Sequence, residues 1–132
     1  MSTPGPATLT PIAHASQRLA AAIGVVPGLR VITTVGTPIA PPAVVIGPPR
    51  LAWRDYNLAG AQPTSAQWNV YLVVSLNQYA IDELLSLVAS VADAIERYTP
   101  GIVVGSVPGT YPSTNGPLPA YTITVQAEIA MM

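Results

Sequence analysis

The chain has 132 residues, the length of a single domain, with a net charge of −1 and no cysteine. Half of its residues are hydrophobic and 8% are charged, compared with about 25% charged residues in typical soluble proteins. This composition excludes an intrinsically disordered chain, a disulfide framework and a cysteine-bound metal, and five arginines without any lysine argue against a nucleic-acid-binding surface.

These few charged side chains cannot cover the surface of an isolated domain. We therefore expect an uncharged surface, much of it buried against other copies or partners of the chain. The mean hydropathy is +0.45, but the longest charge-free stretches, Tyr56–Ile81 and Tyr98–Ala127, carry many polar residues and several prolines, respectively. Neither is typical of a membrane-spanning helix. Met1–Pro11 lacks the basic and apolar segments of a signal peptide, so we expect a soluble, non-exported protein.

The first predicted element is a helix over Pro11–Ile23, preceded by an unstructured arm over about residues 1–9. Thr10 can cap this helix, and a proline suits its first position because that residue needs no hydrogen-bonded N–H. Gly24 is expected to end it. One apolar stripe recurs at helical spacing: Ile12, Ala15, Leu19, Ala22 and Ile23.

Short strands are predicted next, because β-branched residues alternate with proline-rich breaks. Leu29–Val35 is expected to form a strand, and five prolines leave Gly36–Pro49 as a loop with at most a short strand at Ala43–Ile46. Leu51–Tyr56 is expected to be a strand, followed by a polar loop over Leu58–Ala66.

The segment between Thr64 and Thr99 contains no proline or glycine and should hold the most regular structure. Trp68–Leu76 alternates as a strand. Its predicted buried face carries Trp68, Val70, Leu72, Val74 and Leu76, and its other face Asn69, Tyr71, Val73 and Ser75.

Ile81–Tyr98 has the spacing of an amphipathic helix. Asp82 and Glu83 favour its first turn and Arg97 its last turn through the helix dipole. The predicted apolar face carries Ile81, Leu84, Leu85, Val88, Val91, Ala92 and Ile95.

The C-terminal part is predicted to hold a strand over Ile102–Val107, a long turn-rich connection over Pro108–Pro119 and a strand over Ala120–Ala130. The last strand alternates between a buried set (Tyr121, Ile123, Val125, Ala127, Ile129) and a solvated set (Thr122, Thr124, Gln126, Glu128). The whole chain therefore reads as one α+β domain over residues 1–132, with a mostly antiparallel sheet of four to five strands and two helices packed on one face.

No residue set predicts catalysis, a cofactor site or a metal site. His14 is the only imidazole, and nothing near it in the sequence supplies a partner for acid–base chemistry. Four of the six carboxylates lie on the second helix, where Asp93 and Arg97 have the spacing of a surface ion pair. A carboxylate metal site would need three or more convergent ligands, so we interpret this stripe as a solvated helix face.

One cluster is a candidate interface: Arg50, Trp53, Arg54, Asp55 and Tyr56. Arginine beside aromatic residues is the composition favoured at protein–protein contacts. The alternative is a strand end at which the tryptophan packs on the core and the arginines reach water.

Five segments, in this order, carry a resemblance to a known family: "IAHASQRLAAAIG", "VITTVGTPIAPPAVVIGPP", "QWNVYLVV", "YAIDELLSLVASVADAIERY" and "LPAYTITVQAEIAMM". Over essentially the whole chain, this layout resembles the tail terminator proteins of long-tailed, siphovirus-type bacteriophages. The resemblance implies a structural virion protein rather than an enzyme, with an α+β fold and a hexameric ring.

In that family the ring caps the finished tail tube, ends its polymerisation and joins it to the head connector. The implied partners are copies of the chain, the tail tube protein and the head–tail connector or stopper protein. DNA would only pass through the ring lumen, and no membrane is involved. The implied location is the head–tail junction of the virion, and the host cytoplasm during assembly.

Two other classes stay open. The chain could be another neck or head–tail adaptor or a tail-tube subunit, since such proteins share this layout. It could also be a small ligand-binding α+β domain, although it has few His, Asp and Glu side chains. If it is a terminator, the loops Gly36–Pro49 and Pro108–Pro119 are expected to contact the neighbouring subunit, the tube or the connector.

Overall fold

The computed structural model describes residues 10–34, 38–53, 63–114 and 116–132. They form two helices, a short 3-10 turn and a mixed, mostly antiparallel sheet of six strands. In chain order the elements are α1 (Pro11–Ile23), β1 (Arg30–Ile32), β2 (Ala43–Ile46), β3 (Arg50–Ala52), β4 (Ser65–Val73), α2 (Ala80–Tyr98), β5 (Ile102–Tyr111), β6 (Leu118–Glu128) and η1 (Ile129–Met131). The α+β prediction is confirmed, with one strand more than expected.

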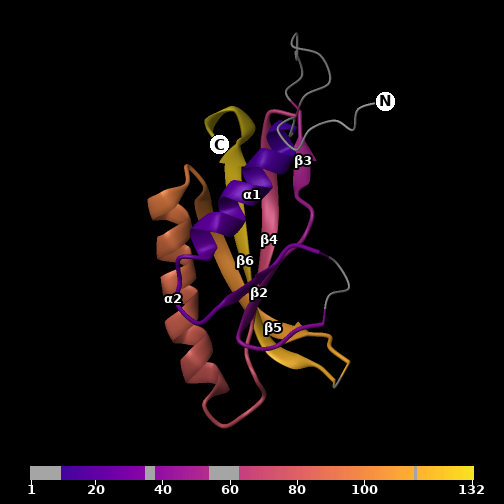
Figure 1. Ribbon diagram of the computed structural model, residues 1–132, viewed down its shortest axis with the longest axis vertical. Helices are drawn as coiled ribbons and strands as arrows, with labels where there is room; N and C mark the ends of the chain where they lie inside the picture. The colour runs from indigo at the N-terminus through magenta and orange to yellow at the C-terminus, as the bar shows by residue number, and fades with distance from the viewer. Residues whose placement is uncertain (1–9, 35–37, 54–62, 115) are drawn as a thin grey trace, which may run out of the picture.

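The strands follow the order β1-β2-β4-β6-β5, and β3 pairs with the first residues of β4. β1 and β2 run parallel, and the other pairings of the described strands are antiparallel. Both helices cover the same face of the sheet, as predicted: α1 crosses it and α2 lies along it (Figure 1). No helix of the described residues covers the opposite face, here called the outer face.

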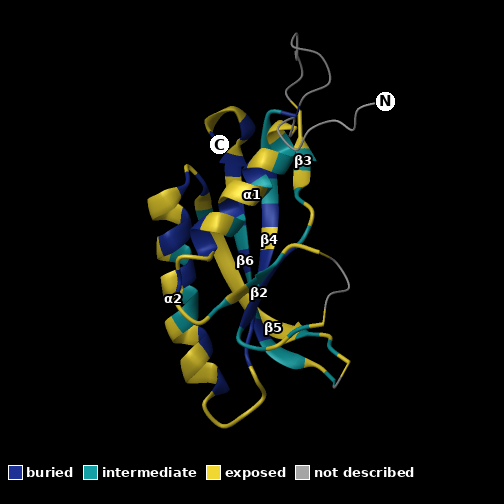
Figure 2. Cartoon of the chain, in the orientation of Figure 1, coloured by how far each residue is buried: buried dark blue, intermediate teal, exposed yellow. Residues whose placement is uncertain are grey.

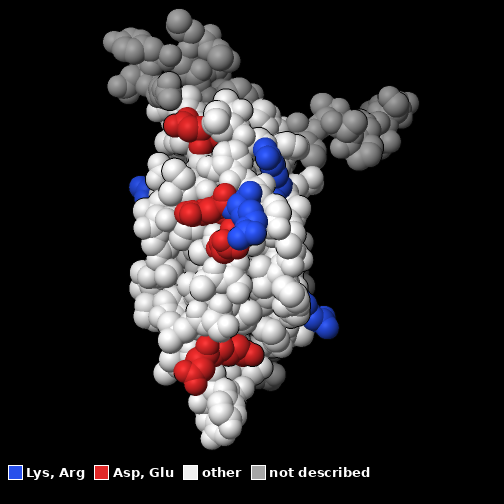
Figure 3. Space-filling view, turned by 90° about the vertical axis from the view of Figure 1, so that its left-hand side faces the viewer, with Lys and Arg blue, Asp and Glu red and all other residues white. Residues whose placement is uncertain are grey.

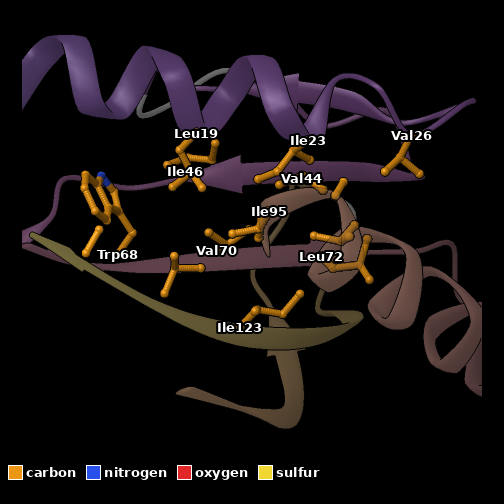
Figure 4. Close-up of a cluster of buried hydrophobic side chains, with 14 of the residues drawn as sticks. Leu19, Ile23, Val26, Val44, Ile46, Trp68, Val70, Leu72, Ile95 and Ile123 are labelled. Atoms are coloured by element: carbon orange, nitrogen blue, oxygen red, sulfur yellow. The ribbon is translucent and has the colours of Figure 1, made fainter. Parts of the chain in front are cut away.

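The core lies between the helices and the sheet (Figure 4). Trp68 pairs with Val125 and Val70 with Ile123 across β4 and β6, so these four fully buried side chains point toward the helices together. The Trp68 Nε1–H donates a hydrogen bond to Ser16 Oγ at 3.0 Å, which joins α1 to β4. The helices add Leu19, Ile23, Val91 and Ile95 to the same cluster.

Local sequence patterns determine α1 and β2, whose bounds are those predicted. Thr10 Oγ1 accepts a hydrogen bond from the Ala13 N–H at 3.1 Å, and Gly24 caps the other end of α1. β1 and β3 have three residues each and end at Ile32 and Ala52, and the last residues of the two predicted strands, 35 and 54–56, lie outside the described residues. The predicted arm over residues 1–9 lies outside the described residues.

β4 is displaced toward the N-terminus of the chain relative to the prediction. Ser65 and Ala66, expected in a polar loop, pair with β6 and β3, so the backbone hydrogen bonds of two neighbours extend the strand over them. At the other end β4 stops at Val73, and Leu76 is 74% exposed rather than buried. The alternation of side chains predicts the faces of a strand but not where its pairing stops.

β5 is longer than predicted, because it continues through Pro108 to Tyr111. Proline is tolerated there because β5 is an edge strand, so its N–H position can face solvent. The connection to β6 is therefore much shorter than the predicted Pro108–Pro119 loop. The far end of the hairpin curls over the outer face of the sheet, since the rings of Tyr111 and Tyr71 on β4 lie 5.5 Å apart.

The buried stripe of α2 differs from the predicted one. Leu84, Val91 and Ile95 are buried as expected, but Ile81 and Leu85 are 72% and 54% exposed, respectively. At about 100° per residue, the predicted apolar residues span about 120° of the helix surface, with Ile81 and Leu85 at one end of this arc. Buried Ala80 and Ala94 extend the apolar surface beyond the other end. The sheet and α1 cover this wide apolar arc from the flank of Ala80 and Ala94 to its middle, which leaves the flank of Ile81 and Leu85 outside the core.

Candidate interaction surfaces

The predicted interface cluster is only partly described. Arg50 lies exposed on β3, and Trp53, directly after that strand, is 51% exposed. Arg54, Asp55 and Tyr56 lie outside the described residues. The structure thus places two members of the cluster at one border of the sheet.

Arginines from two strands lie along this border. Arg50 pairs with Gln67, next to the inward-facing Trp68, so its side chain faces the outer side of the sheet. Arg30 of β1 pairs with Ala43, which itself pairs with Val73, and this row also faces outward. The name arginine edge is used below for Arg30, Ile32, Arg50 and Trp53.

Apolar side chains lie exposed where α2 begins. The α2 patch consists of Leu76, Tyr79, Ile81 and Leu85, whose exposed fractions are 74%, 64%, 72% and 54%. Leu76 and Tyr79 lie in the connection from β4, and Ile81 and Leu85 follow one turn apart on the helix. Exposed Asp82 and Glu83 lie in the same first turn of the helix.

A second apolar surface follows β5 and the C-terminal turn. Figure 2 shows β5 mostly exposed, and its large exposed apolar side chains are Ile102, Val104 and Val107. Ile102 and Val104, together with Pro100 and Met131, border a surface hollow of about 400 Å³. The name β5 patch is used for Pro100, Ile102, Val104, Val107 and Met131.

The backbone of β5 is partly protected against pairing with another strand. The Glu96 side chain on α2 accepts a hydrogen bond from the Val103 N–H at 2.9 Å. A bulge at Val104 interrupts the register, and Pro108 has no N–H to donate. These are devices by which edge strands avoid edge-to-edge association, so this surface offers side chains more than backbone groups.

Charged side chains on the α2 side of the molecule form a few small groups, and uncharged surface separates these groups (Figure 3). The predicted Asp93–Arg97 ion pair is present, with an N···O distance of 3.1 Å. Arg18 donates a hydrogen bond to the backbone oxygen of Met132. Among the described residues, no hydrogen bond or ion pair involves the side chains of four exposed residues: Arg30, Arg50, Asp82 and Glu83.

Residues with acid–base or metal-binding chemistry do not gather in the described part of the chain. His14 is exposed on α1. Within residues 10–34, 38–53, 63–114 and 116–132, no group of three His, Cys, Asp or Glu side chains is placed to hold a metal. None of the helices in these ranges is long and apolar enough to span a membrane.

Sequence reasoning missed the α2 patch, because it assigned Leu76, Ile81 and Leu85 to buried faces. The width of the apolar arc on α2 was the available indication, since it exceeds the surface that one sheet face and one helix cover. No model of a known protein family matches the chain, and no curated protein is significantly similar to it.

Proposed function

We propose that this chain is a structural virion protein of the tail-terminator type. Copies of it assemble into a ring that caps a phage tail tube, ends its polymerisation and joins it to the head connector. The ring is located at the head–tail junction of the virion and forms in the host cytoplasm. Its partners are other copies, the tail tube protein and the connector or stopper protein.

The observation that carries this proposal is the amount of apolar side-chain surface that the fold leaves exposed. The α2 patch and the β5 patch lie on different elements, and both hold several side chains that are more than half exposed. Single exposed apolar residues are ordinary on a monomer, whereas grouped ones mark contact surfaces. A subunit with two neighbours and two axial partners needs several such surfaces.

The proline-rich loop and the end of the β5–β6 hairpin offer a further surface. Pro38, Ile39 and Pro41 border a hollow together with Tyr111, Pro112 and Leu118, which come from the other end of the chain. Prolines limit the conformational entropy that such loops lose on docking. This favours a role as a rigid contact toward the tube or the connector.

The test is co-assembly with the tail tube protein of the same phage, followed by electron microscopy. We expect tubes that grow without limit when the tube protein is alone and short tubes with a ring at one end when the chain is added. A Leu85→Asp variant, which places a charge in the α2 patch, serves as the weakened comparison. Filaments formed by the chain alone would identify a tube subunit instead, and unchanged tube lengths would refute the terminator role.

A further inference from the structure

The geometry points to a specific contact between copies: the α2 patch of one subunit docks on the arginine edge of the next. This inference rests on the proposed ring and names the surfaces that would form it. The occupant of the α2 patch is therefore a second copy of this chain.

The first argument is area. With about 200 Å² for a large side chain, the exposed fractions in the α2 patch correspond to about 500 Å² of apolar surface. One side of a standard stable interface buries about 800 Å². The patch therefore supplies more than half of one side of such an interface, and the exposed acidic side chains of the same helical turn add polar surface.

The second argument is charge complementarity. Asp82 and Glu83 lie in the first turn of α2, between Ile81 and Leu85 in the sequence, and Arg30 and Arg50 lie on the arginine edge. All four are exposed, and none is paired within the described part of the chain. In a chain with so few charges, an unpaired acidic pair and two unpaired arginines are complementary surfaces on the same molecule.

The third argument is placement. Arg30 and Arg50 face the outer side of the sheet, whereas α2 covers the opposite side, so the two surfaces of one molecule do not meet. Their β4 neighbours Val73 and Gln67 are six residues apart, so the two arginines lie about 20 Å apart along the sheet. A standard contact of about 800 Å² is about 30 Å across, so it includes both arginines together with Ile32 and Trp53.

A contact between two different surfaces is heterologous, and repeating it produces a closed ring or an open filament. A contact of this kind is what the proposed function requires between neighbouring subunits. An isologous dimer formed through the α2 patch would instead bring the acidic first turns of two copies together, which like-charge repulsion disfavours.

The experiment uses two charge-reversal variants of the full chain. The first carries Asp82→Arg with Glu83→Arg, and the second carries Arg30→Glu with Arg50→Glu. Alone, each variant presents like charges on both surfaces, and we expect at least a tenfold rise in the concentration for half-maximal association, measured by light scattering. Mixed at equal ratio, they restore association, because each patch then meets an oppositely charged edge on the other variant.

A matched control places two arginines one turn apart on the side of the same helix that faces away from Leu85, as Ser86→Arg with Ser90→Arg, and should associate like the wild type. Near-ultraviolet circular dichroism checks that all variants are folded. Association that is unchanged in both reversal variants, or a mixture that fails to recover, overturns the contact while leaving the ring intact. Reversal variants that still form rings but no longer cap tubes would assign the patch to the tube protein instead. A wild type that never associates refutes the ring on which this contact depends.

Discussion

Two adjacent leucines on α2 separate the role of the core from that of the exposed flank. Leu84 is 4% exposed and packs in the core cluster, whereas Leu85 is 54% exposed in the α2 patch. The two residues share helix, side-chain chemistry and sequence neighbourhood. Replacing each with alanine therefore measures the environment alone.

For Leu84→Ala we expect a loss of about 3 kcal/mol in the free energy of unfolding, since removing a buried leucine side chain costs about 2–5 kcal/mol. In a domain of this size that corresponds to a fall of about 10 °C in Tm. For Leu85→Ala we expect a change within about 0.5 kcal/mol, because the side chain is already half exposed and alanine favours the helix.

The assay is urea unfolding at a protein concentration low enough to keep both variants monomeric, followed by light scattering at higher concentration. Leu85→Ala should weaken association at unchanged monomer stability. Equal losses of stability in the two variants would refute the assignment of Leu85 to a contact surface. Association of the Leu85→Ala variant at the wild-type concentration would also refute this assignment.

Three further predictions concern contacts inside the subunit. Ser16→Ala leaves the buried Trp68 N–H without its acceptor and should lower the free energy of unfolding by about 1–3 kcal/mol in urea titrations, with Ser86→Ala as an exposed control. Gly101→Ala would place a Cβ 3.1 Å from Val125 Cγ1 and 3.0 Å from Thr99 Oγ1, so thermal unfolding should show a destabilisation of about 1–3 kcal/mol; an unchanged Tm would contradict this packing. Asp93→Asn removes an exposed ion pair and should cost no more than about 0.5 kcal/mol, and a larger loss would contradict a surface role for that pair.

Much of the fold could be predicted because the responsible interactions are local. The cap at Thr10, the proline at the first helical position and the stop at Gly24 determine α1 within a few residues of each end. Prolines on both sides isolate β2 in the same way. Such patterns act over one turn or one strand, so a single sequence contains them.

Other features depend on pairing between distant segments. Ser65 and Ala66 join β4 because β6 and β3 supply partners, and Pro108 stays in β5 because that strand lies at an edge. The sequence around each of these residues does not indicate either pairing. Propensity and polarity therefore predict loops at both places, and tertiary pairing overrides them.

The candidate surfaces follow the same division. The arginine–tryptophan cluster could be selected by composition, and Arg50 and Trp53 do lie exposed at the sheet border. The α2 patch could not be identified from the sequence, because the apolar flank of a helix has the same sequence pattern whether the core or a neighbouring subunit covers it. Only the positions of the sheet and α1 show which part of the arc they leave uncovered.

The mass of the purified chain in solution tests most directly whether it is a ring-forming subunit. Light scattering coupled to size exclusion, over a range of protein and salt concentrations, gives that mass without a model of the contact. We predict a closed species near six subunits that dissociates on dilution. A single-chain mass at every concentration and salt would contradict self-assembly through the exposed apolar surfaces.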